Sequence, residues 1–402
     1  MEEIVSIIER PIYMNQIRPY IGKDTIKVLT GQRRVGKSYI LKALANEIRR
    51  EDPSANFITI NLENFAFSHI TDAKSLYDEI NVRLSQDRKN YIFLDEIQEV
   101  ENFDRVVRSL ALDAANDIYL TGSNSSMLSS EMASRLAGRS IEVKVHPLSY
   151  GEFMQFHGLE DSDSTLRSFL RYGGLPYLRN LPNQATWMEY IEGIANAVVF
   201  RDVVTRHSVR NTDFLQRLLL FLADNIGQIF TAKKIADYLK SQRQTASVSG
   251  VQTYVGYIEE AYIINRSRRW EIEGKRFFEI GEKFFFEDLG IRNSIVGYRP
   301  QDISGLMENA VYNHLVINGY KVCVGVLKGG REVDFIAEKG NEKKYIQVAM
   351  TVLDEATASR EFGNLEVIPD NYEKILVTLR DTFPNTYKGI KTMTLREFLM
   401  SL

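Results

Sequence analysis

Cysteine and long hydrophobic runs are scarce in this sequence. Cys323 is the single cysteine among 402 residues, so no disulfide bond can form within the chain. The best apolar run, Leu218–Ala223, is far shorter than the roughly 20 residues that a membrane-spanning helix needs. The beginning of the sequence, Met1–Glu3, is acidic and lacks the charged and then apolar order of a signal peptide. We therefore expect a cytoplasmic protein with no part in a membrane.

An excess of charge of one sign is also missing. The 50 basic residues nearly balance the 53 acidic residues, which leaves a net charge of −3. Overall charge therefore does not steer the protein to nucleic acid, and a nucleic-acid partner would need a local basic patch. The five histidines are scattered without the spacing of metal ligands, which argues against a structural zinc site. They are His69, His146, His157, His207 and His314.

The sequence does contain short apolar runs that alternate with longer helical stretches. A chain of 402 residues is expected to form two to four domains. In the first part the apolar runs are rich in Ile, Val, Phe and Tyr, which is typical of a parallel sheet covered by helices on both faces. These predicted strands are Ile26–Leu29, Phe57–Leu62, Tyr91–Leu94, Ile118–Leu120 and Ile141–Val145.

The pattern changes after Pro147, and it divides the chain into four predicted regions. Residues 1–150 form the α/β core, and residues 151–211 form a helical, lid-like segment. Residues 212–300 begin helical and end with short strands, and residues 301–402 form a second α/β domain. In this last domain a helix leads into three predicted strands, which are Tyr320–Leu327, Glu332–Ala337 and Lys344–Val348.

A complete phosphate-binding motif lies between the first predicted strand and a predicted helix over Ser38–Arg50. The segment GQRRVGKS matches G-x-x-x-x-G-K-[ST], whose glycines let backbone N–H groups converge on phosphate oxygens. Lys37 is expected to reach the β- and γ-phosphates of ATP, and the Ser38 hydroxyl is expected to ligate Mg²⁺. The predicted nucleotide-binding residues are Gly31, Gln32, Arg33, Arg34, Val35, Gly36, Lys37, Ser38 and Tyr39.

Two acidic residues follow the predicted strand Tyr91–Leu94. Asp95 is expected to hold Mg²⁺ together with Ser38, and Glu96 is expected to orient and deprotonate the attacking water. An apolar run followed by Asp-Glu is weak evidence by itself, since many strands end in solvated acids. Together with the complete phosphate motif, it predicts a site that hydrolyses ATP.

Further catalytic candidates follow the predicted strand Ile118–Leu120. Ser123 or Asn124 would contact the γ-phosphate or the attacking water, and the alternative is a simple loop start. Arg135 and Arg139 would stabilise the transition state, either within one subunit or across a subunit interface. A surface salt bridge is the alternative for both arginines.

Residues 212–300 contain the order of elements of a winged helix. Thr231 would cap a helix over Ala232–Leu239, a second helix follows, and strands are predicted over Ala261–Ile264 and Phe277–Ile280. Such a module can place its second helix in the major groove of DNA. Basic residues gather near the wing, and the alternative is a solvated loop on a packing or partner-binding module. The candidate DNA contacts are Arg266, Arg268, Arg269, Lys275 and Arg276.

The last domain has the layout of a PD-(D/E)xK nuclease. Glu308 lies on a predicted helix, Asp334 on a strand and Gln347 on the next strand. Enzymes with this layout hold Mg²⁺ with carboxylates and use a lysine to assist the attacking water. Ala349 stands at the position of that lysine here. We therefore expect a degenerate nuclease-like site of Glu308, Asp334 and Gln347, used for recognition instead of cleavage.

These segments together resemble a known family. The segments GQRRVGKS, FLDEIQ, LTGSN, SRLAGR, PLSYGEF and YGGLP are similar to motifs of AAA-type (ASCE) P-loop ATPases of bacteria and archaea, over nearly the whole chain. The resemblance implies an ATPase domain followed by a helical segment, a winged helix and a C-terminal domain of unknown function, DUF4143. It also implies that Ser123 or Asn124 is the polar sensor, and it favours Arg139 as the arginine finger.

The leading prediction is an ATP-hydrolysing switch or motor that uses Mg²⁺ and repositions its C-terminal modules on DNA or protein. One alternative is a signalling ATPase that recognises a protein partner without DNA. The other alternative is a metal-dependent nuclease. An arginine finger that acts between subunits would also require a homo-oligomer.

Overall fold

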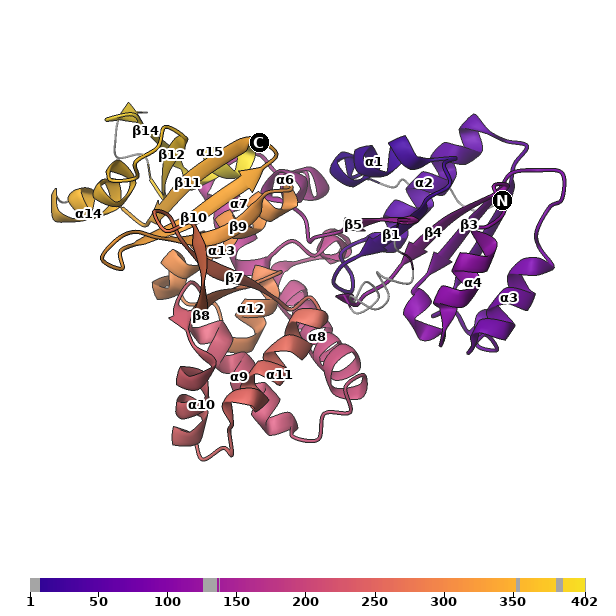
Figure 1. Ribbon diagram of the computed structural model, residues 1–402, viewed down its shortest axis with the longest axis horizontal. Helices are drawn as coiled ribbons and strands as arrows, with labels where there is room; N and C mark the ends of the chain where they lie inside the picture. Colours follow the sequence, from indigo (N-terminus) through magenta and orange to yellow (C-terminus); the bar gives the residue numbers. More distant parts are fainter. Residues whose placement is uncertain (1–7, 126–135, 137, 352–354, 381–385, 402) are drawn as a thin grey trace. The chain divides into compact units, whose positions relative to one another are not determined.

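The computed structural model describes residues 8–125, 136, 138–351, 355–380 and 386–401. Contacts within the chain divide it into two compact units (Figure 1). The first comprises Met1–His146 with Glu260–Tyr262, and the second comprises Pro147–Glu259 with Ile263–Leu402. Within these described ranges, no helix combines the length and the apolar character that crossing a membrane requires.

The first unit is built on a five-stranded sheet whose strands all run parallel, in the order β2-β3-β4-β1-β5. Its central strands β1, β3 and β4 are buried along their whole length, as expected for a sheet covered on both faces. The predicted parallel sheet is therefore confirmed. The strands are β1 (Ile26–Thr30), β2 (Asn56–Asn61), β3 (Asn90–Asp95), β4 (Asn116–Thr121) and β5 (Ser140–Lys144).

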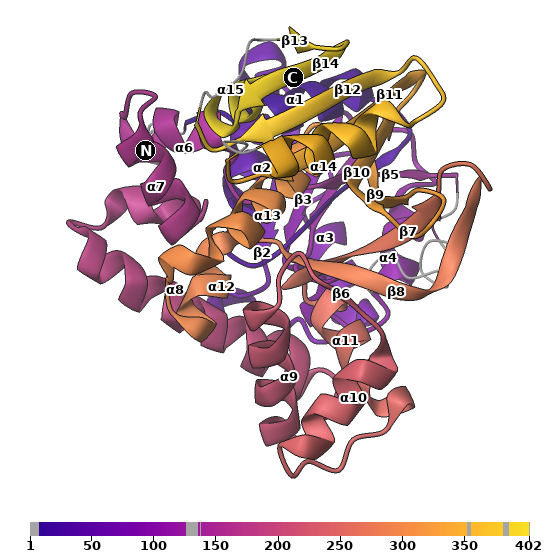
Figure 2. The same ribbon diagram turned by 90° about the vertical axis from the view of Figure 1, so that its left-hand side faces the viewer.

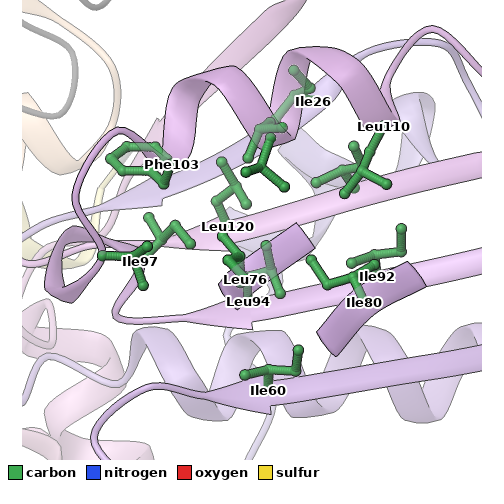
Figure 3. Packing of buried hydrophobic residues seen from close by; sticks show 14 of the residues in the cluster. Ile26, Ile60, Leu76, Ile80, Ile92, Leu94, Ile97, Phe103, Leu110 and Leu120 are labelled. Carbon is green, nitrogen blue, oxygen red and sulfur yellow. The ribbon is translucent and has the colours of Figure 1, made fainter. Parts of the chain in front are cut away.

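Alternate residues of β3 explain why this sheet has an apolar layer on each face. Ile92 and Leu94 belong to a cluster with helices α3 and α4, which Figure 3 shows, whereas Tyr91 and Phe93 pack in a second cluster with α1 and α2. The helices are α1 (Pro11–Ile17), α2 (Lys37–Glu51), α3 (Ala73–Asn81) and α4 (Phe103–Leu110), with short 3-10 helices η1 (Arg18–Tyr20), η2 (Phe65–Phe67) and η3 (Ile97–Glu99).

The second unit contains a nine-stranded mixed sheet in the order β13-β14-β12-β11-β10-β9-β7-β8-β6. The antiparallel hairpin of β7 and β8 joins β9 because Arg269–Glu271 pair in parallel with Val324–Val326 (Figure 2). The hairpin and the last strands of the chain therefore form one continuous sheet. The strands are β6 (Ile229–Phe230), β7 (Ile264–Glu271), β8 (Arg276–Phe286), β9 (Lys321–Val326), β10 (Glu332–Lys339), β11 (Glu342–Ala349), β12 (Glu373–Thr378), β13 (Thr386–Tyr387) and β14 (Ile390–Thr394).

Most helices of the second unit lie before and between these strands. Thr231 caps α10 as predicted, because its side chain accepts a hydrogen bond from the N–H of Lys234. The helices are α6 (Tyr150–His157), α7 (Asp163–Tyr172), α8 (Gln184–Val198), α9 (Thr212–Asp224), α10 (Ala232–Ser241), α11 (Val248–Glu260), α12 (Leu289–Val296), α13 (Ile303–Ile317), α14 (Glu355–Glu366) and α15 (Leu395–Met400), with η5 (Pro176–Asn180), the π-helix η6 (Val199–Thr205) and η7 (Pro300–Asp302).

The YGGLP segment after α7 is a packing point inside this unit. The N–H of Gly174 donates a 2.7 Å hydrogen bond to the Asp288 carboxylate, which also caps α12. A Cβ atom at Gly173, where φ is 72°, would lie 2.3 Å from that carboxylate, and one at Gly174 would lie 2.4 Å from the carbonyl oxygen of Leu148. The two glycines are thus explained by close approach of the chain.

The prediction of a strand over Ala261–Ile264 is wrong, because β7 begins only at Ile264. Helix α11 ends in a turn in which Tyr262 has a φ of 54° and the N–H of Ile263 donates to the carbonyl oxygen of Ile258 at 3.1 Å. This left-handed residue with a bond back into the helix is a common way to end a helix. Arg266, Arg268 and Arg269 consequently lie in a strand instead of a loop.

Candidate active site

The glycine-rich loop connects β1 to α2 at the carboxyl edge of the parallel sheet. Gly31 has a φ of 134°, and a Cβ atom there would lie 2.1 Å from the carbonyl oxygen of Val145. Gly36, with a φ of 99°, directly precedes the first residue of α2. Both conformations strongly favour glycine. The loop therefore presents its backbone beside a helix N-terminus, which is the geometry that binds phosphate.

Lys37 extends back over this loop. Its amino group donates hydrogen bonds of 2.9 Å to the carbonyl oxygens of Gly31 and Gln32, and it lies 3.8 Å from Glu96 Oε1. The Gln32 side chain is fully buried, and neither of its amide atoms has a hydrogen-bond partner among the described residues. The loop thus contains an ammonium group and a buried amide that are both suited to an anionic ligand.

The remaining loop residues differ in exposure. Val35 is buried, and its carbonyl oxygen accepts a 2.9 Å hydrogen bond from the buried Arg10 guanidinium. Arg34 and Tyr39 are exposed, and Tyr39 retains 51% of its accessible surface. The predicted binding segment is therefore fixed on its buried side and open on the other.

Asp95 ends β3, and hydroxyl and amide groups surround its carboxylate. The hydroxyl groups of Ser38 and Thr121 lie 3.0 and 2.5 Å from Oδ1, and Asn61 Nδ2 lies 3.0 Å from Oδ2. Burial raises the pKa of Asp95, although the hydrogen bonds from Thr121 and Ser38 oppose this rise. Hydroxyl and carboxylate oxygens are the hard ligands that Mg²⁺ takes in proteins. Ser38 and Asp95 therefore fit the predicted metal pair.

Glu96 follows in a left-handed conformation with a φ of 57°. Its carboxylate accepts a 2.5 Å hydrogen bond from Gln98 and lies 3.9 Å from the Arg33 guanidinium, which also pairs with Glu63 at 2.7 Å. Burial alone would raise the pKa of Glu96, but the charge of Lys37, the Gln98 hydrogen bond and the charge of Arg33 outweigh it and lower the pKa. The carboxylate is therefore ionised near neutral pH, as a base must be.

Ser123 and Asn124 follow β4 and are both fully buried. The Ser123 hydroxyl accepts a 3.3 Å hydrogen bond from the same Gln98 amide that donates to Glu96. Gln98 thus links the predicted base to one of the two predicted sensor residues.

Thr121, Gln98 and Asn61 complete this site without belonging to the predicted set. Besides its bond to Asp95, the Thr121 hydroxyl accepts a 2.9 Å hydrogen bond from the N–H of Glu96. Each of the three residues lies at or just beyond the carboxyl end of a neighbouring strand. That position is the one sequence feature that could have pointed to them.

Of the two predicted arginines, only Arg139 is described, and it is not brought to the loop. Arg135 lies outside the described residues. Arg139 is exposed and precedes β5, where its carbonyl oxygen accepts a 2.7 Å hydrogen bond from the N–H of Ile26 at the start of β1. The phosphate loop follows the opposite end of β1, five residues away, or about 16 Å of parallel strand.

The predicted DNA contacts occupy the β7–β8 hairpin with unequal exposure. Arg266 forms ion pairs with Glu259 and, at 3.5 Å, with Glu282, and Arg269 is half-buried. Arg268, Lys275 and Arg276 are exposed, and Arg276 pairs with Glu271 at 2.7 Å. The hairpin therefore presents fewer available cations than its sequence implies. The exposed basic residues are Arg268, Lys275 and Arg276.

Glu308, Asp334 and Gln347 are brought together in the second unit. Gln347 Oε1 accepts a long 3.4 Å hydrogen bond from the N–H of Asp334, and the buried Lys283 bridges Asp334 to Glu308. Lys283, on β8, is a member of this cluster that the local sequence pattern does not reveal.

Comparison with known proteins matches residues 23–154 to a family described as an AAA domain and residues 163–302 to a domain of unknown function, DUF8612. The expected DUF4143 domain over residues 301–402 is not confirmed, because the matched domain of unknown function is a different one and lies earlier in the chain.

Relatives cover most of the chain. An uncharacterized protein of Haemophilus influenzae is 32% identical over 98% of this chain and 99% of its own length. An uncharacterized protein of Methanocaldococcus jannaschii is 30% identical over 85% of this chain and 78% of its own length. Among solved structures, a Walker-type ATPase of Pyrococcus abyssi superposes with a TM-score of 0.50 and 16% identity, over 72% of this chain and 96% of that chain. At that identity the likeness is one of fold.

Proposed function

This chain belongs to the same family as the Haemophilus influenzae protein and contains an AAA domain, and on that basis we propose that it binds ATP with Mg²⁺ and hydrolyses it. The observation that carries the proposal is the meeting of Lys37, Ser38, Asp95 and Glu96 at the carboxyl edge of one parallel sheet. The ionised carboxylate of Glu96 next to Lys37 supports hydrolysis over binding alone.

In the proposed reaction Lys37 binds oxygens of the β- and γ-phosphates and offsets the negative charge that develops on them. Ser38 and Asp95 would hold Mg²⁺, which supplies further neutralisation of the phosphates. Glu96 accepts a proton from the attacking water as the water oxygen bonds to the γ-phosphorus. The bond from the γ-phosphorus to the bridging oxygen breaks, its electron pair leaves with ADP, and phosphate is released.

Gln98 supports a role for Ser123 in positioning that water. One amide group contacts both the base Glu96 and the Ser123 hydroxyl, so a ligand that moves Ser123 would also move the base. We therefore place Ser123 ahead of Asn124 as the sensor, with Asn124 as the second candidate.

The replacement Glu96→Gln tests the proposed base, because it keeps the shape and removes the ability to accept the proton. We expect phosphate release to fall by about 10²–10³-fold while ATP binding is retained. The matched control is Glu101→Gln, an exposed acid of the following turn, which should release phosphate at the wild-type rate. Unchanged turnover in Glu96→Gln would contradict the assignment.

Arg139 fits a role between subunits better than one within its own subunit, since it lies at the opposite end of β1 from the phosphate loop. A mixing experiment tests this proposal. Lys37→Ala keeps Arg139 but loses the nucleotide site, whereas Arg139→Ala keeps the site. Partial recovery of phosphate release in a mixture of the two inactive variants supports action across an interface, and no recovery contradicts it.

For the second unit we propose that the elements α9, β6, α10, α11, β7 and β8 form a winged helix and that the strands after it form a nuclease-like fold. The order of these elements and the pairing of β8 with both β6 and β7 support this interpretation. The nucleotide state of the first unit would then control what the second unit binds, as in a molecular switch or motor.

DNA is the first proposed partner of the second unit, through the exposed Arg268 and Lys275. The test is DNA-stimulated ATP turnover and salt-dependent DNA binding in Arg268→Glu/Lys275→Glu. Each lost phosphate contact should lower the slope of log affinity against log salt by about 1. Lys388→Glu/Lys391→Glu changes the same charge on another exposed part of this sheet and is the control.

A protein partner is the alternative, and one observation favours it. Phe277 on the hairpin is 53% exposed, while acids neutralise Arg266 and Arg276. If DNA neither binds to the wild-type protein nor stimulates its turnover, a protein partner is the hypothesis that remains.

A further inference from the structure

Lys283 of β8 is the centre of a buried ionic cluster in the second unit. Its side chain is only 3% exposed, and its amino group lies 3.0 Å from Glu308 Oε2 and 3.3 Å from Asp334 Oδ1. It also pairs directly with Glu332. These three acids come from helix α13 and strand β10, so the cluster joins three elements that are distant in sequence.

The pairing of the strands explains how Lys283 reaches these acids. Lys283 pairs with Ser267 of β7 and Ile229 of β6, and β7 in turn joins β9 of the last domain. Helix α13 packs against both β8 and β10. The hairpin thus supplies a cation to a site whose acids lie on the other elements.

Both carboxylate oxygens of Asp334 are already engaged by the protein. Asp334 Oδ2 accepts a 2.9 Å hydrogen bond from the N–H of Val348, while Oδ1 faces Lys283. The side-chain oxygen of Gln347 is directed to a backbone N–H instead of the cluster centre. Within the described ranges, no three acidic, histidine or cysteine side chains converge in a way that could hold a metal ion.

A nuclease-like fold implies a divalent cation between Glu308 and Asp334, but these residues do not fit one. Mg²⁺ needs oxygens at about 2.0–2.1 Å in octahedral geometry. An ammonium group at hydrogen-bond distance from the same oxygens would repel a metal ion placed beside it. Lys283 thus contacts the two acids that would have to hold the cation.

We propose that the ammonium group of Lys283 is the resident cation of the Glu308–Glu332–Asp334 cluster, so that this nuclease-like site is closed to divalent metal by the protein's own side chain. Burial and the charge of Asp334 raise the pKa of Glu308 to about 8 and leave it protonated at neutral pH, which removes one negative charge that a bound ion would otherwise have to neutralise. Loss of Lys283 would open a divalent-cation site.

The test measures thermal unfolding of the full chain, without nucleotide, in the presence and absence of MnCl₂. Trp187 and Trp270, the two tryptophans of the chain, both belong to the second unit, so their fluorescence reports on that unit. We expect no change in the wild-type midpoint. For Lys283→Met, Mn²⁺ at about a hundred times its dissociation constant should raise the midpoint by about 5–10 °C.

Three comparisons make the experiment decisive. Lys344→Met removes a lysine that pairs with Glu373 in the same sheet, and it should show no Mn²⁺ response. Lys283→Met/Asp334→Asn should lose the response, and persistence of it would overturn the proposal. A wild-type response that Asp334→Asn abolishes would also overturn it, because metal would then bind beside Lys283.

If Lys283→Met does not fold, the Mn²⁺ test can be made with a second variant. Lys283→Gln/Glu332→Gln removes one acid together with the cation, so it leaves less uncompensated charge. A folded variant of either kind whose Mn²⁺ response does not exceed that of Lys344→Met would contradict the proposal.

Discussion

Two lysines of this protein, Lys37 in the first unit and Lys283 in the second, are each 3% exposed beside carboxylates, yet their amino groups have different partners. Lys37 donates to two backbone carbonyl oxygens and stands 3.8 Å from Glu96 Oε1. Lys283 is in direct contact with three acids. The amino group of Lys37 donates to carbonyl oxygens and can bind an anionic ligand instead, whereas Lys283 already serves as the counterion of a buried acidic cluster.

The pKa values of the glutamates beside these two lysines are shifted in opposite directions. The pKa of Glu96 is lowered, since Lys37, Gln98 and Arg33 outweigh its burial. The pKa of Glu308 is raised to about 8 by burial and by the charge of Asp334. One glutamate is therefore ready to accept a proton at neutral pH, and the other already carries one.

Removing Lys283 should have the largest effect on stability. Lys283→Met leaves buried acids without their counterion, and breaking such a pair costs about 3–5 kcal/mol. Lys344→Met, which breaks a pair with the more exposed Glu373, should cost no more than about 1 kcal/mol. Urea unfolding followed by the tryptophan fluorescence of the second unit measures both. Equal losses in the two variants would contradict the role of Lys283 as the counterion of a buried cluster.

The second largest effect should be the change in the free energy of unfolding with pH. Because the pKa of Glu308 is raised in the folded state, its contribution is complete below the unfolded value of about 4.5 and is lost as pH rises through about 8. Each unit of pKa difference corresponds to about 1.4 kcal/mol, so the loss amounts to a few kcal/mol.

Glu308→Gln is the control for this prediction. It should flatten the decline of the urea midpoint between pH 5 and pH 9, because glutamine does not titrate. A variant that declines as steeply as the wild type would place the titration on another group.

Replacing Thr121 should have the smallest effect of these changes. Its hydroxyl group donates to Asp95 and accepts from the N–H of Glu96, so Thr121→Ala leaves buried partners unpaired at a cost of about 1–2 kcal/mol. We expect kcat/KM for ATP to fall by about tenfold. Thr121→Ser keeps the hydroxyl and should retain activity near that of the wild type. Equal losses in both variants would show that the methyl group, not the hydroxyl, matters.

The sequence was sufficient for the part of the first site that is contiguous in the chain. The loop Gly31–Ser38 and the pair Asp95–Glu96 each follow a strand, and parallel strands bring their carboxyl ends to one edge. Their meeting is therefore a consequence of the strand pattern. Thr121 and Asn61 arrive at the same edge, but an isolated Thr or Asn at a strand end carries no comparable signal.

The second site was harder to predict because its lysine arrives through long-range pairing. The local pattern groups Glu308, Asp334 and Gln347, and it leaves Ala349 in the position of the expected lysine. Lys283 enters because the hairpin of β7 and β8 joins β9, and no local periodicity reveals which strands of a mixed sheet will be neighbours.

The most direct test of the account is equilibrium binding of ATP in the presence of Mg²⁺. We expect the wild-type protein to bind, Lys37→Ala to lose at least about 30-fold in affinity because a buried charged contact is removed, and Lys42→Ala, an exposed lysine of the same helix, to bind as the wild type does. A wild-type protein that retains no nucleotide, or a Lys37→Ala protein that binds equally well, would contradict the assignment of this site.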